Sequence, residues 1–227
     1  MKISVIIPAL NEAANLEAMV RSIGEGHQVI VADGGSIDST RAVAAGLGAL
    51  VVRSAPGRGA QMDCGALGAE GDALLFLHAD TVLPDGWAES VREAMGDERV
   101  VGGAFRLRIS SGRAFYRVIE RMATARFRLF GLIYGDQAIF VRREGFFKAG
   151  GFGALPLMED VDCVRRLRRL GRLTLLERSV VTSPRRWEER GILKNTIWNW
   201  LTLILYFMGV PPQRLYGFYY GRPRAGS

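Results

Sequence analysis

Three short polar segments contain the residues whose types and spacing suit chemistry on a nucleotide or a metal ion. They are residues 8–12 (PALNE), 33–40 (DGGSIDST) and 78–80 (HAD), and each directly follows an apolar run. Asp33 ends such a run, and a buried carboxylate is costly unless a donor binds it; the imide N–H of a nucleobase is such a donor. His78 and Asp80 offer a nitrogen and an oxygen ligand to a divalent ion.

Each segment also has a purely structural interpretation. Asn11 can cap the helix that follows it, and Gly34 and Gly35 can turn the chain. Asp38 can satisfy free amides at a helix start, which is the preferred interpretation for that residue. A His-x-Asp sequence in a loop is commonly hydrogen-bonded structure, so this pair taken alone does not establish a metal site.

Apolar patterning predicts the elements that position these segments. Strand and helix patterns alternate along the first hundred residues, with strands at 3–7, 29–32, 50–52 and 73–77 and helices at 15–23, 39–47 and 60–69. This order predicts an α/β protein with a doubly wound, mostly parallel sheet of Rossmann type, flanked by helices. Ligands bind beyond the carboxyl ends of strands in such sheets, so the three polar segments are expected to meet at one rim.

The pattern changes after residue 100. The sequence predicts a strand at 100–109, a basic helix at 113–130, a strand at 137–141 and an arginine-rich helix at 161–170. No linker rich in Pro, Gly and Ser separates the two halves, so a single domain over residues 1–227 is expected. Residues 197–210 are the most apolar stretch, and as a helix of about 21 Å they are too short to cross a hydrocarbon core of about 30 Å alone.

Charge is unevenly distributed along the chain. Residues 1–100 have seven basic and 14 acidic side chains, whereas residues 101–227 have 23 basic and nine acidic. Of the 30 basic residues 27 are arginine, whose planar guanidinium suits phosphate. An anionic lipid or a phosphorylated substrate would fit this imbalance, and a solvated arginine-rich face is the alternative. Nucleic acid is not expected, because no zinc-finger spacing, RNA-recognition signature or basic heptad region is present.

Composition and cysteine content narrow the class of protein further. With 48% apolar and 23% charged residues, the chain is neither disordered nor collagen-like. Its two cysteines, Cys64 and Cys163, are too few for a zinc cluster or a disulfide framework and are expected to be reduced thiols in helical patterns. The first residues lack the sections of a signal peptide, which predicts a cytoplasmic protein.

The motifs taken together are more specific than any one of them. In order they are residues 4–12 (SVIIPALNE), 33–40 (DGGSIDST), 57–59 (GRG), 76–80 (FLHAD), 135–137 (GDQ) and 158–160 (MED). This series resembles glycosyltransferase family 2 and is most similar to the bacterial radical-SAM/selenodomain-associated transferase subgroup, which has a similar His-Ala-Asp.

The resemblance implies a GT-A fold that binds a nucleoside diphosphate sugar in residues 1–100, with a catalytic and acceptor-binding part in 101–190 and a helical acceptor-side segment in 191–227. It implies donor contacts at Pro8, Leu10, Asn11, Glu12, Asp33, Gly34, Ser36, Arg58, Ala79 and Asp80. It also implies that Asp80, with His78, holds a divalent cation, Mn2+ or Mg2+. The sequence departs from the family pattern at His78, where the family has an aspartate, and it lacks the C-terminal histidine ligand of some relatives.

The implied reaction needs few groups. A cation stabilises the negative charge that develops on the leaving diphosphate, so no separate acid is required. One carboxylate on the opposite face can activate the acceptor hydroxyl, and direct attack inverts the anomeric centre. By resemblance the catalytic pair is Asp160, as the base, and Glu159, and both can instead cap the following helix.

Contacts to the sugar or the acceptor are expected from a further set of residues, Asp136, Gln137, Arg186 and Trp187. A turn explains the first two equally well, and packing explains the last two. Residues 182–184 (TSP) lack the glutamine that precedes Arg-Trp in processive polysaccharide synthases, so processive synthesis is not expected.

Three rival functions differ from this interpretation. A noncatalytic nucleotide-sugar-binding protein is the alternative suggested by the missing first aspartate of the metal motif. A sugar nucleotidyltransferase or an oxidoreductase would need a glycine-rich loop after the first strand, where Pro8 and Leu10 stand instead.

The basic and aromatic residues of the second half suggest a membrane contact. The arginines at 113, 117 and 121 recur at four-residue intervals, and Trp198, Trp200 and Tyr206 lie on the apolar helix. They could form a platform on anionic lipid at the inner face of a membrane, close to a lipid-linked acceptor. Core packing and a homodimer contact are the alternatives.

Overall fold

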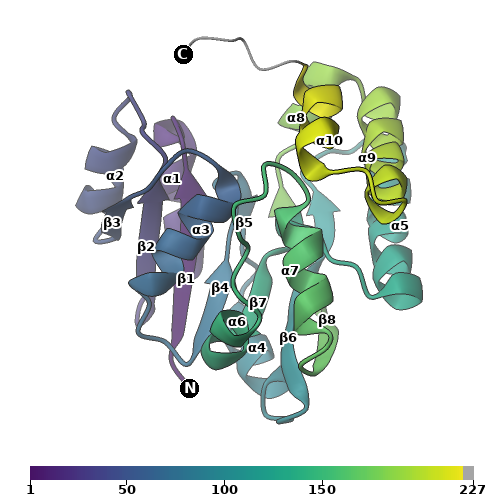
Figure 1. Ribbon diagram of the computed structural model, residues 1–227. Helices are drawn as coiled ribbons and strands as arrows, with labels where there is room; N and C mark the ends of the chain where they lie inside the picture. Colours follow the sequence, from purple (N-terminus) through teal and green to yellow (C-terminus); the bar gives the residue numbers. More distant parts are fainter. Residues whose placement is uncertain (222–227) are drawn as a thin grey trace.

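The computed structural model describes residues 1–221, apart from the side chains of Arg186 and Arg190. Its strands form one curled sheet with helices packed against it (Figure 1). The first elements are β1 (Ile3–Ala9), α1 (Ala13–Ile23), β2 (Gln28–Asp33), α2 (Thr40–Gly46), β3 (Leu50–Arg53), α3 (Arg58–Leu67), β4 (Ala73–Phe76), β5 (Thr81–Val82) and α4 (Trp87–Ala94). The later elements are β6 (Val100–Ile109), α5 (Ala114–Phe130), the 3-10 helix η1 (Gly135–Gln137), β7 (Ile139–Arg142), α6 (Arg143–Lys148), α7 (Glu159–Leu167), β8 (Arg172–Thr182), α8 (Arg185–Arg190), α9 (Ile192–Phe207) and α10 (Pro212–Tyr220).

The sheet combines a parallel half with a mixed half. Among the described residues it has eight strands in the order β3-β2-β1-β4-β7-β6-β8-β5. The first four pair in parallel, as the alternating pattern of residues 1–100 predicts. β7 is antiparallel to both of its neighbours, whereas β6 and β8 pair in parallel. The predicted α/β fold is therefore confirmed, with the reversed strand β7 joining its two halves and the short β5 antiparallel to β8 at one edge.

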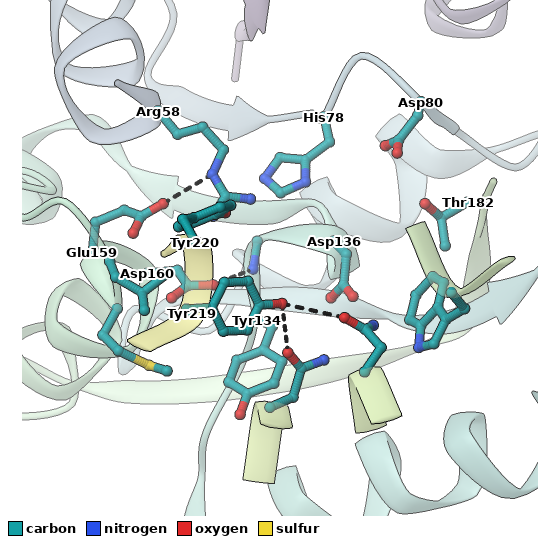
Figure 2. Close-up of a pocket in the computed structure, with 16 residues that line it drawn as sticks. Arg58, His78, Asp80, Tyr134, Asp136, Glu159, Asp160, Thr182, Tyr219 and Tyr220 are labelled. Carbon is teal, nitrogen blue, oxygen red and sulfur yellow. Dashed lines mark hydrogen bonds and ion pairs between the residues drawn. The ribbon is translucent and has the colours of Figure 1, made fainter. Parts of the chain in front are cut away.

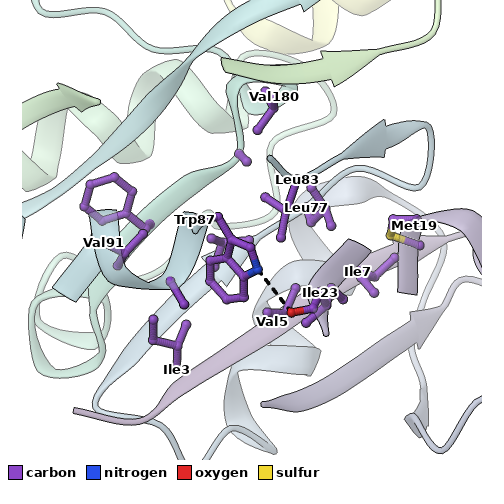
Figure 3. Close-up of a cluster of buried hydrophobic side chains, with 14 of the residues drawn as sticks. Ile3, Val5, Ile7, Met19, Ile23, Leu77, Leu83, Trp87, Val91 and Val180 are labelled. Carbon is purple, nitrogen blue, oxygen red and sulfur yellow. Dashed lines mark hydrogen bonds between the residues drawn. The ribbon is translucent and has the colours of Figure 1, made fainter. Parts of the chain in front are cut away.

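Alternation along β1 builds a hydrophobic core on each face of the sheet. Val5 and Ile7 point to one face and join a cluster with residues of α1 and α4, including Met19 and Trp87 (Figure 3). Ile6 points to the other face and packs among residues of α3, α6 and α7. Successive side chains of a strand point to opposite faces, so a strand buried on both sides is apolar throughout.

Several elements have boundaries that the sequence patterns did not predict. The helices α4, α6, α8 and α10 and the strands β5 and β8 were not predicted, and β8 is half-exposed along much of its length. β5 has only two residues, and it exists because Thr81 and Val82 pair with the end of β8. α7 begins at Glu159, two residues before the predicted start. Gln137 was predicted to begin a strand but lies in η1.

The topology brings the predicted motifs to one edge of the sheet. β1 and β2 run in parallel register with Ala9 opposite Asp33, so the loops after these strands leave the sheet side by side. β4 is the other neighbour of β1 and also runs parallel to it, so residues 78–80 follow at the same edge. Within residues 1–221, no helix combines the length and apolar character needed to cross a membrane.

Candidate active site

The loops after β1 and β2 form a cross-linked unit, here called the nucleoside loops (residues 8–12 and 33–40). The Ser36 hydroxyl accepts a hydrogen bond from the Asn11 backbone N–H at 2.9 Å, and the Asn11 side-chain oxygen accepts one from the Ile37 N–H at 3.0 Å. The Thr40 hydroxyl likewise accepts from the Glu12 N–H at 2.9 Å. Asn11 therefore links the two loops. It does not cap α1, whose N-cap residue is Glu12.

Asp33 is buried as predicted, but its carboxylate already has donors within the chain. It is 1% exposed and accepts hydrogen bonds from the backbone N–H groups of Gly35, at 3.3 Å, and Ser36, at 3.2 Å. Arg41 lies 3.8 Å away. Its burial is therefore compensated within the chain. The prediction that Asp33 needs an external partner for this reason is wrong. Its place at the sheet edge remains compatible with contact to a nucleobase.

Other residues of the nucleoside loops divide into buried and accessible ones. Pro8, Gly34 and Ser36 are buried, whereas Leu10 is 47% exposed and Asn11 is also exposed. Leu10 and Ile37, which is 94% exposed, are thus the apolar side chains of these loops that are open to a ligand. None of the nucleoside-loop residues lines the pocket described below, but an ion pair of 3.2 Å between Glu12 and Arg185 joins the loops to α8.

A residue that was not predicted, Gln61, hydrogen-bonds to the backbone where both loops leave the sheet. The Gln61 side-chain amide, 3% exposed, donates to the carbonyl of Ala9 at 2.8 Å and to that of Ala32 at 2.9 Å. A Cβ at Gly34 would lie 2.9 Å from the Gln61 amide carbon, which explains the glycine at that position. The signal in the sequence is a glutamine on the apolar face of a predicted helix.

A pocket next to these loops collects many of the predicted site residues (Figure 2). The predicted residues that line it come from both halves of the chain and are Arg58, His78, Asp80, Asp136, Glu159, Asp160 and Trp187. Lining residues that were not predicted include Tyr134, Thr182, Asn195, Asn199, Tyr219 and Tyr220. Ala79, between His78 and Asp80, is buried and does not line the pocket.

Asp160 lies at the start of α7, with its carboxylate held by two backbone amides. The Gly135 N–H donates to it at 2.8 Å and the Val161 N–H at 2.7 Å. The turn that presents it has Met158 in the left-handed region, at φ 66°. The two donors orient the Asp160 carboxylate within the pocket.

Glu159 is engaged in an ion pair across the pocket. Its carboxylate lies 3.2 Å from the Arg58 guanidinium, and its side chain is 6% exposed. Burial lowers the pKa of Arg58, but Glu159, Tyr220 and Asp160 raise it by more, so that its pKa lies above the usual value. Arg58 is therefore a permanent cation of the pocket, and Tyr220 lies beside it (Figure 2).

The helix α3 that carries Arg58 also fixes the approach to α7. The Asp63 carboxylate accepts hydrogen bonds from the backbone N–H groups of Phe152 at 2.8 Å and Gly153 at 2.9 Å. A Cβ at Gly59 would lie 2.7 Å from the Gly153 carbonyl oxygen, so α3 and this loop are in close contact. Asp63 was not predicted as a site residue, and it acts by positioning the segment that leads to Glu159.

His78 and Asp80 lie near each other on one side of the pocket (Figure 2). A Cβ at Gly135 would lie 2.6 Å from the His78 Nε2, so the imidazole is packed closely against the backbone that also binds Asp160. The backbone carbonyl of Asp80 accepts from the Ser183 N–H at 3.1 Å, which fixes this loop to the end of β8.

The donor set in the pocket can hold a divalent cation only with help from a ligand. Within residues 1–221, no group of three or more His, Cys, Asp and Glu side chains is arranged to bind a metal ion. His78 and Asp80 supply one nitrogen and one carboxylate, which fits a cation that takes its other ligands from water and diphosphate oxygens.

The remaining predicted sugar contacts have different surroundings. Gln137 is fully buried outside the pocket lining; its side-chain oxygen accepts from Arg126 at 2.8 Å and its amide donates to the Phe105 carbonyl at 3.2 Å. Its neighbour Asp136 does line the pocket. Trp187 is 7% exposed and packs edge-on against Tyr116, with one part reaching the pocket wall. The side chain of Arg186 lies outside the described residues.

The C-terminal helices, expected as an acceptor-side segment, supply one wall of the pocket through residues that were not predicted as site residues. The Tyr219 hydroxyl of α10 lies 2.8 Å from the Asn199 side-chain oxygen and 3.4 Å from that of Asn195, both on α9. Asn195 is 2% exposed, and its Nδ2 has no partner among the described residues. This amide is therefore a donor that a bound molecule can use. The four-residue spacing of the two asparagines in an apolar helix was the available signal.

A match to a known family profile shows the family to which this chain belongs. The sequence profile described as Glycosyl transferase family 2 matches residues 4–155, more than half of the chain. The chain belongs to glycosyl transferase family 2. The matched range contains the nucleoside loops, Arg58 and residues 78–80, whereas Asp160 and the C-terminal helices follow it.

Sequence relatives of this family 2 chain align over part of its length. An uncharacterized glycosyltransferase of Mycobacterium tuberculosis is 35% identical over 85 residues, which are 37% of this chain and 39% of the relative. Glucosyl-3-phosphoglycerate synthase of the same organism is 34% identical over 96 residues, 36% of this chain and 30% of the synthase. The aligned parts are well under half of each relative.

Solved structures resemble this family 2 chain over more of its length. TarS of S. aureus has a TM-score of 0.65 at 14% identity, covering 98% of this chain and 44% of TarS. Glucosyl-3-phosphoglycerate synthase of M. tuberculosis, in complex with Mn2+, UDP and glucosyl-3-phosphoglycerate, has a TM-score of 0.58 at 22% identity, covering 92% and 81%. At these identities the likeness establishes the fold, which is the expected GT-A-like one; membership of the radical-SAM-associated subgroup stays a prediction.

Proposed function

We propose that this chain transfers a sugar from a nucleoside diphosphate sugar, with uridine or guanosine as the nucleoside, to an acceptor hydroxyl. The observation that carries the proposal is the pocket, where an oriented carboxylate, a permanent cation and the pair of His78 and Asp80 share one space. Two relatives in fold have been solved with such donors or their products, S. aureus TarS with UDP-GlcNAc and the M. tuberculosis synthase with UDP.

The nucleoside loops and the pocket divide the binding of the donor between them. The nucleoside loops lie at the carboxyl ends of β1 and β2, where open sheets of this kind bind ligands. Asp33 and the exposed Leu10 there would contact the base, and the diphosphate would then extend past the end of β4 toward residues 78–80. The link between Glu12 and Arg185 holds the two parts of this path together.

Arg58, His78 and Asp80 act on the leaving group. Breaking the anomeric bond places negative charge on the diphosphate, and the fixed guanidinium of Arg58 stabilises that charge without transferring a proton. His78 and Asp80 would hold a divalent cation, which supplies further charge stabilisation when bound. Glu159 keeps Arg58 in place through their ion pair and is in this account a positioning residue rather than a base.

Asp160 acts on the acceptor. Its carboxylate accepts two backbone hydrogen bonds, which orient it, and a carboxylate has further lone pairs to accept the proton of an acceptor hydroxyl. With one base and direct displacement, the anomeric configuration inverts. The Asn195 amide and Asp136 line the pocket and would bind hydroxyl groups of the sugar or the acceptor.

A noncatalytic nucleotide-sugar-binding protein is the second candidate. The observation in its favour is the donor set, which holds only two metal-ligating side chains in its motif, with His78 in the position of the family's first aspartate. This protein would bind nucleotide sugars and would form no product with any acceptor.

The experiment combines donor binding with product formation. Thermal shift with a panel of UDP- and GDP-sugars, with and without Mn2+, identifies the donor, since a ligand of the native state raises the melting temperature. Hydrolysis or transfer is then measured for the wild type, Asp160→Asn and, as a matched control from the same turn of α7, Asp162→Asn. Asp162 bonds to Tyr206 and Arg166 and does not line the pocket.

We expect Asp160→Asn to lower turnover by about 100-fold or more with donor binding retained, and Asp162→Asn to remain within a few-fold of the wild type. Turnover preserved in Asp160→Asn would refute the base assignment. Donor binding with no turnover of the wild-type chain, across donors and acceptors, would favour the noncatalytic protein.

A further inference from the structure

The helix α9 packs Leu203 in the core but also buries polar side chains and exposes apolar ones on its outer face. Its polar side chains Asn195 and Thr202 are buried, at 2% and 3% exposed. Its apolar side chains face outward at intervals of three or four residues, and the exposed ones are Leu193, Ile197, Leu201, Ile204, Phe207 and Met208. Residues at this spacing share one face of a helix, so the outward face of α9 is a continuous apolar stripe. We call these six residues the α9 apolar surface.

A neighbouring cavity extends this surface and adds positive charge at one end. Ile204, Phe207 and Met208 line it together with Phe130, 53% exposed at the end of α5, and with Arg165 and Arg168 of α7. The Arg165 guanidinium lies 5.3 Å from the centre of the Phe207 ring, so the cation is held directly against the apolar surface.

The other end of the α9 apolar surface is also basic. Leu193 lines a shallow cavity with Phe115, Arg113 and Lys194, and Glu188 is the acidic residue there. The sequence has no Asp or Glu after residue 189. The surface therefore combines an exposed apolar centre with cations at both ends, in the half of the chain that has 23 basic and nine acidic residues.

We propose that the α9 apolar surface docks on an anionic lipid bilayer, with α9 lying in the plane of the interface. Apolar side chains of such a helix enter the boundary between headgroups and acyl chains, and flanking Lys and Arg side chains bind anionic headgroups. A second copy of this chain fits less well. In either orientation, pairing two copies along α9 brings basic ends against basic ends, whereas a bilayer presents the opposite charge.

This docking places the pocket close to the lipid. The buried face of α9 contributes Asn195 and Asn199 to the pocket, while the opposite face carries Leu193, Ile197 and Ile204. The pocket then lies about one helix diameter, roughly 10 Å, from the headgroups. The docking is argued from α9 and its neighbours alone and does not depend on the transfer reaction.

The test is vesicle flotation of the full chain. One set of vesicles contains phosphatidylcholine alone, and in the other part of that lipid is replaced by phosphatidylglycerol. We expect the protein to float with the anionic vesicles, to remain in solution with the neutral ones, and to lose binding as salt is raised. Protein that stays in solution with both sets would overturn the proposal.

Two variants and a matched control assign the binding to α9. Ile197→Gln/Ile204→Gln removes two exposed apolar side chains and is expected to lower the partition coefficient by about tenfold or more. Lys194→Gln/Arg165→Gln removes two charges and is expected to lower the partition coefficient by roughly fivefold for each charge. Leu67→Gln changes a 74% exposed apolar residue on α3 and should bind as the wild type does.

The outcomes separate a lipid surface from a protein contact. All of these side chains are partly or fully exposed, and thermal unfolding of each variant checks that it is folded. Wild-type binding by Ile197→Gln/Ile204→Gln would overturn the proposal. So would a dimer, measured by light scattering without lipid, that this variant converts to a monomer, because the surface would then bind a second copy.

Discussion

The nucleoside loops and the pocket are two neighbouring parts of one site that are built in different ways. The nucleoside loops are held by bonds among residues 9–61, most of them from backbone amides, and their polar groups have partners within the loops themselves. The pocket takes side chains from α3, the β4–β5 loop, η1, α7, α8, α9 and α10. Its key contacts join distant residues, such as Arg58 and Glu159, which are 101 positions apart.

The nucleoside loops are therefore preorganised by local contacts, whereas the pocket depends on packing between distant elements. The nucleoside loops form once β1, β2 and α3 have folded, because their bonds are local to those elements. The pocket forms only after the C-terminal helices have packed against α7 and η1. A defect in the loops should thus affect donor recognition, whereas a defect in the pocket should couple stability to activity.

Breaking the ion pair of Arg58 and Glu159 should have the largest effect on stability. Arg58→Met leaves the Glu159 carboxylate buried without its cation, and we expect a loss of about 3 kcal/mol in the free energy of unfolding. This lies at the low end for buried pairs, because the Arg58 side chain keeps 32% exposure. Denaturant unfolding measures the loss.

The double variant Arg58→Met/Glu159→Gln separates stability from donor binding. It removes both charges and should recover most of the lost stability, while donor affinity stays low because the guanidinium is absent. Full donor affinity in this variant would show that Arg58 serves only the fold, and the contrast between the two regions would then disappear.

Removing the Asp80 carboxylate should weaken binding of the cation and leave the stability of the fold unchanged. Asp80→Ala deletes one of the two metal-ligating side chains of the motif, and we expect the Mn2+ concentration for half-maximal donor binding to rise by about 100-fold. Calorimetric titration of UDP at several Mn2+ concentrations gives this value. Asp85→Ala, at an exposed position on the following loop, is the control and should be unchanged. An unaltered metal requirement in Asp80→Ala would remove Asp80 from the cation site.

The nucleoside loops can be tested through Gln61. Gln61→Leu leaves the buried carbonyls of Ala9 and Ala32 without their side-chain donor, and we expect a loss of about 2 kcal/mol in the free energy of unfolding. Donor affinity should fall with it, because both loops start at these carbonyls. The exposed Gln213→Leu is the control. Unchanged stability in Gln61→Leu would mean that the loops do not need this support.

The smallest effect is expected at the C-terminal wall. Tyr219→Phe removes the hydroxyl that contacts Asn195 and Asn199 and should cost less than about 1 kcal/mol, because an amide oxygen at the pocket wall can bind water instead. The KM for the acceptor should change by more than that for the donor. Tyr216→Phe, on the same helix, is the control. An equal change in both KM values would show that α10 does not distinguish the two substrates.

Much of the fold was predictable because its signals are local. Buried strands such as β1 read as apolar runs, and α1 shows the helical spacing of Leu16, Met19 and Ile23. β5 and β8 were missed because their strand character depends on pairing with each other and with β6. The antiparallel direction of β7 was also missed, because an apolar run of four residues carries no information about direction.

The candidate site was likewise predictable only where its residues belong to short sequence motifs. The family resemblance assigned Arg58, His78, Asp80 and Asp160 to one donor and catalytic site, and these four residues line one pocket. Gln61 and Asp63 were missed because each acts through backbone groups far along the chain, which no motif records. The burial of Gln137 was missed for a similar reason, since its partners Arg126 and Phe105 belong to other elements.

By itself the sequence determined the alternation of strands and helices, the rim on which the motifs lie and the family to which they belong, because each follows from side-chain types at short spacing. Only the tertiary structure decided that Asp33 is satisfied by its own loop, that Glu159 pairs with Arg58, and that α9 buries Asn195 while exposing a stripe of apolar residues. The physical reason is that burial and pairing of a polar group depend on what packs against it, and those partners are distant in the chain.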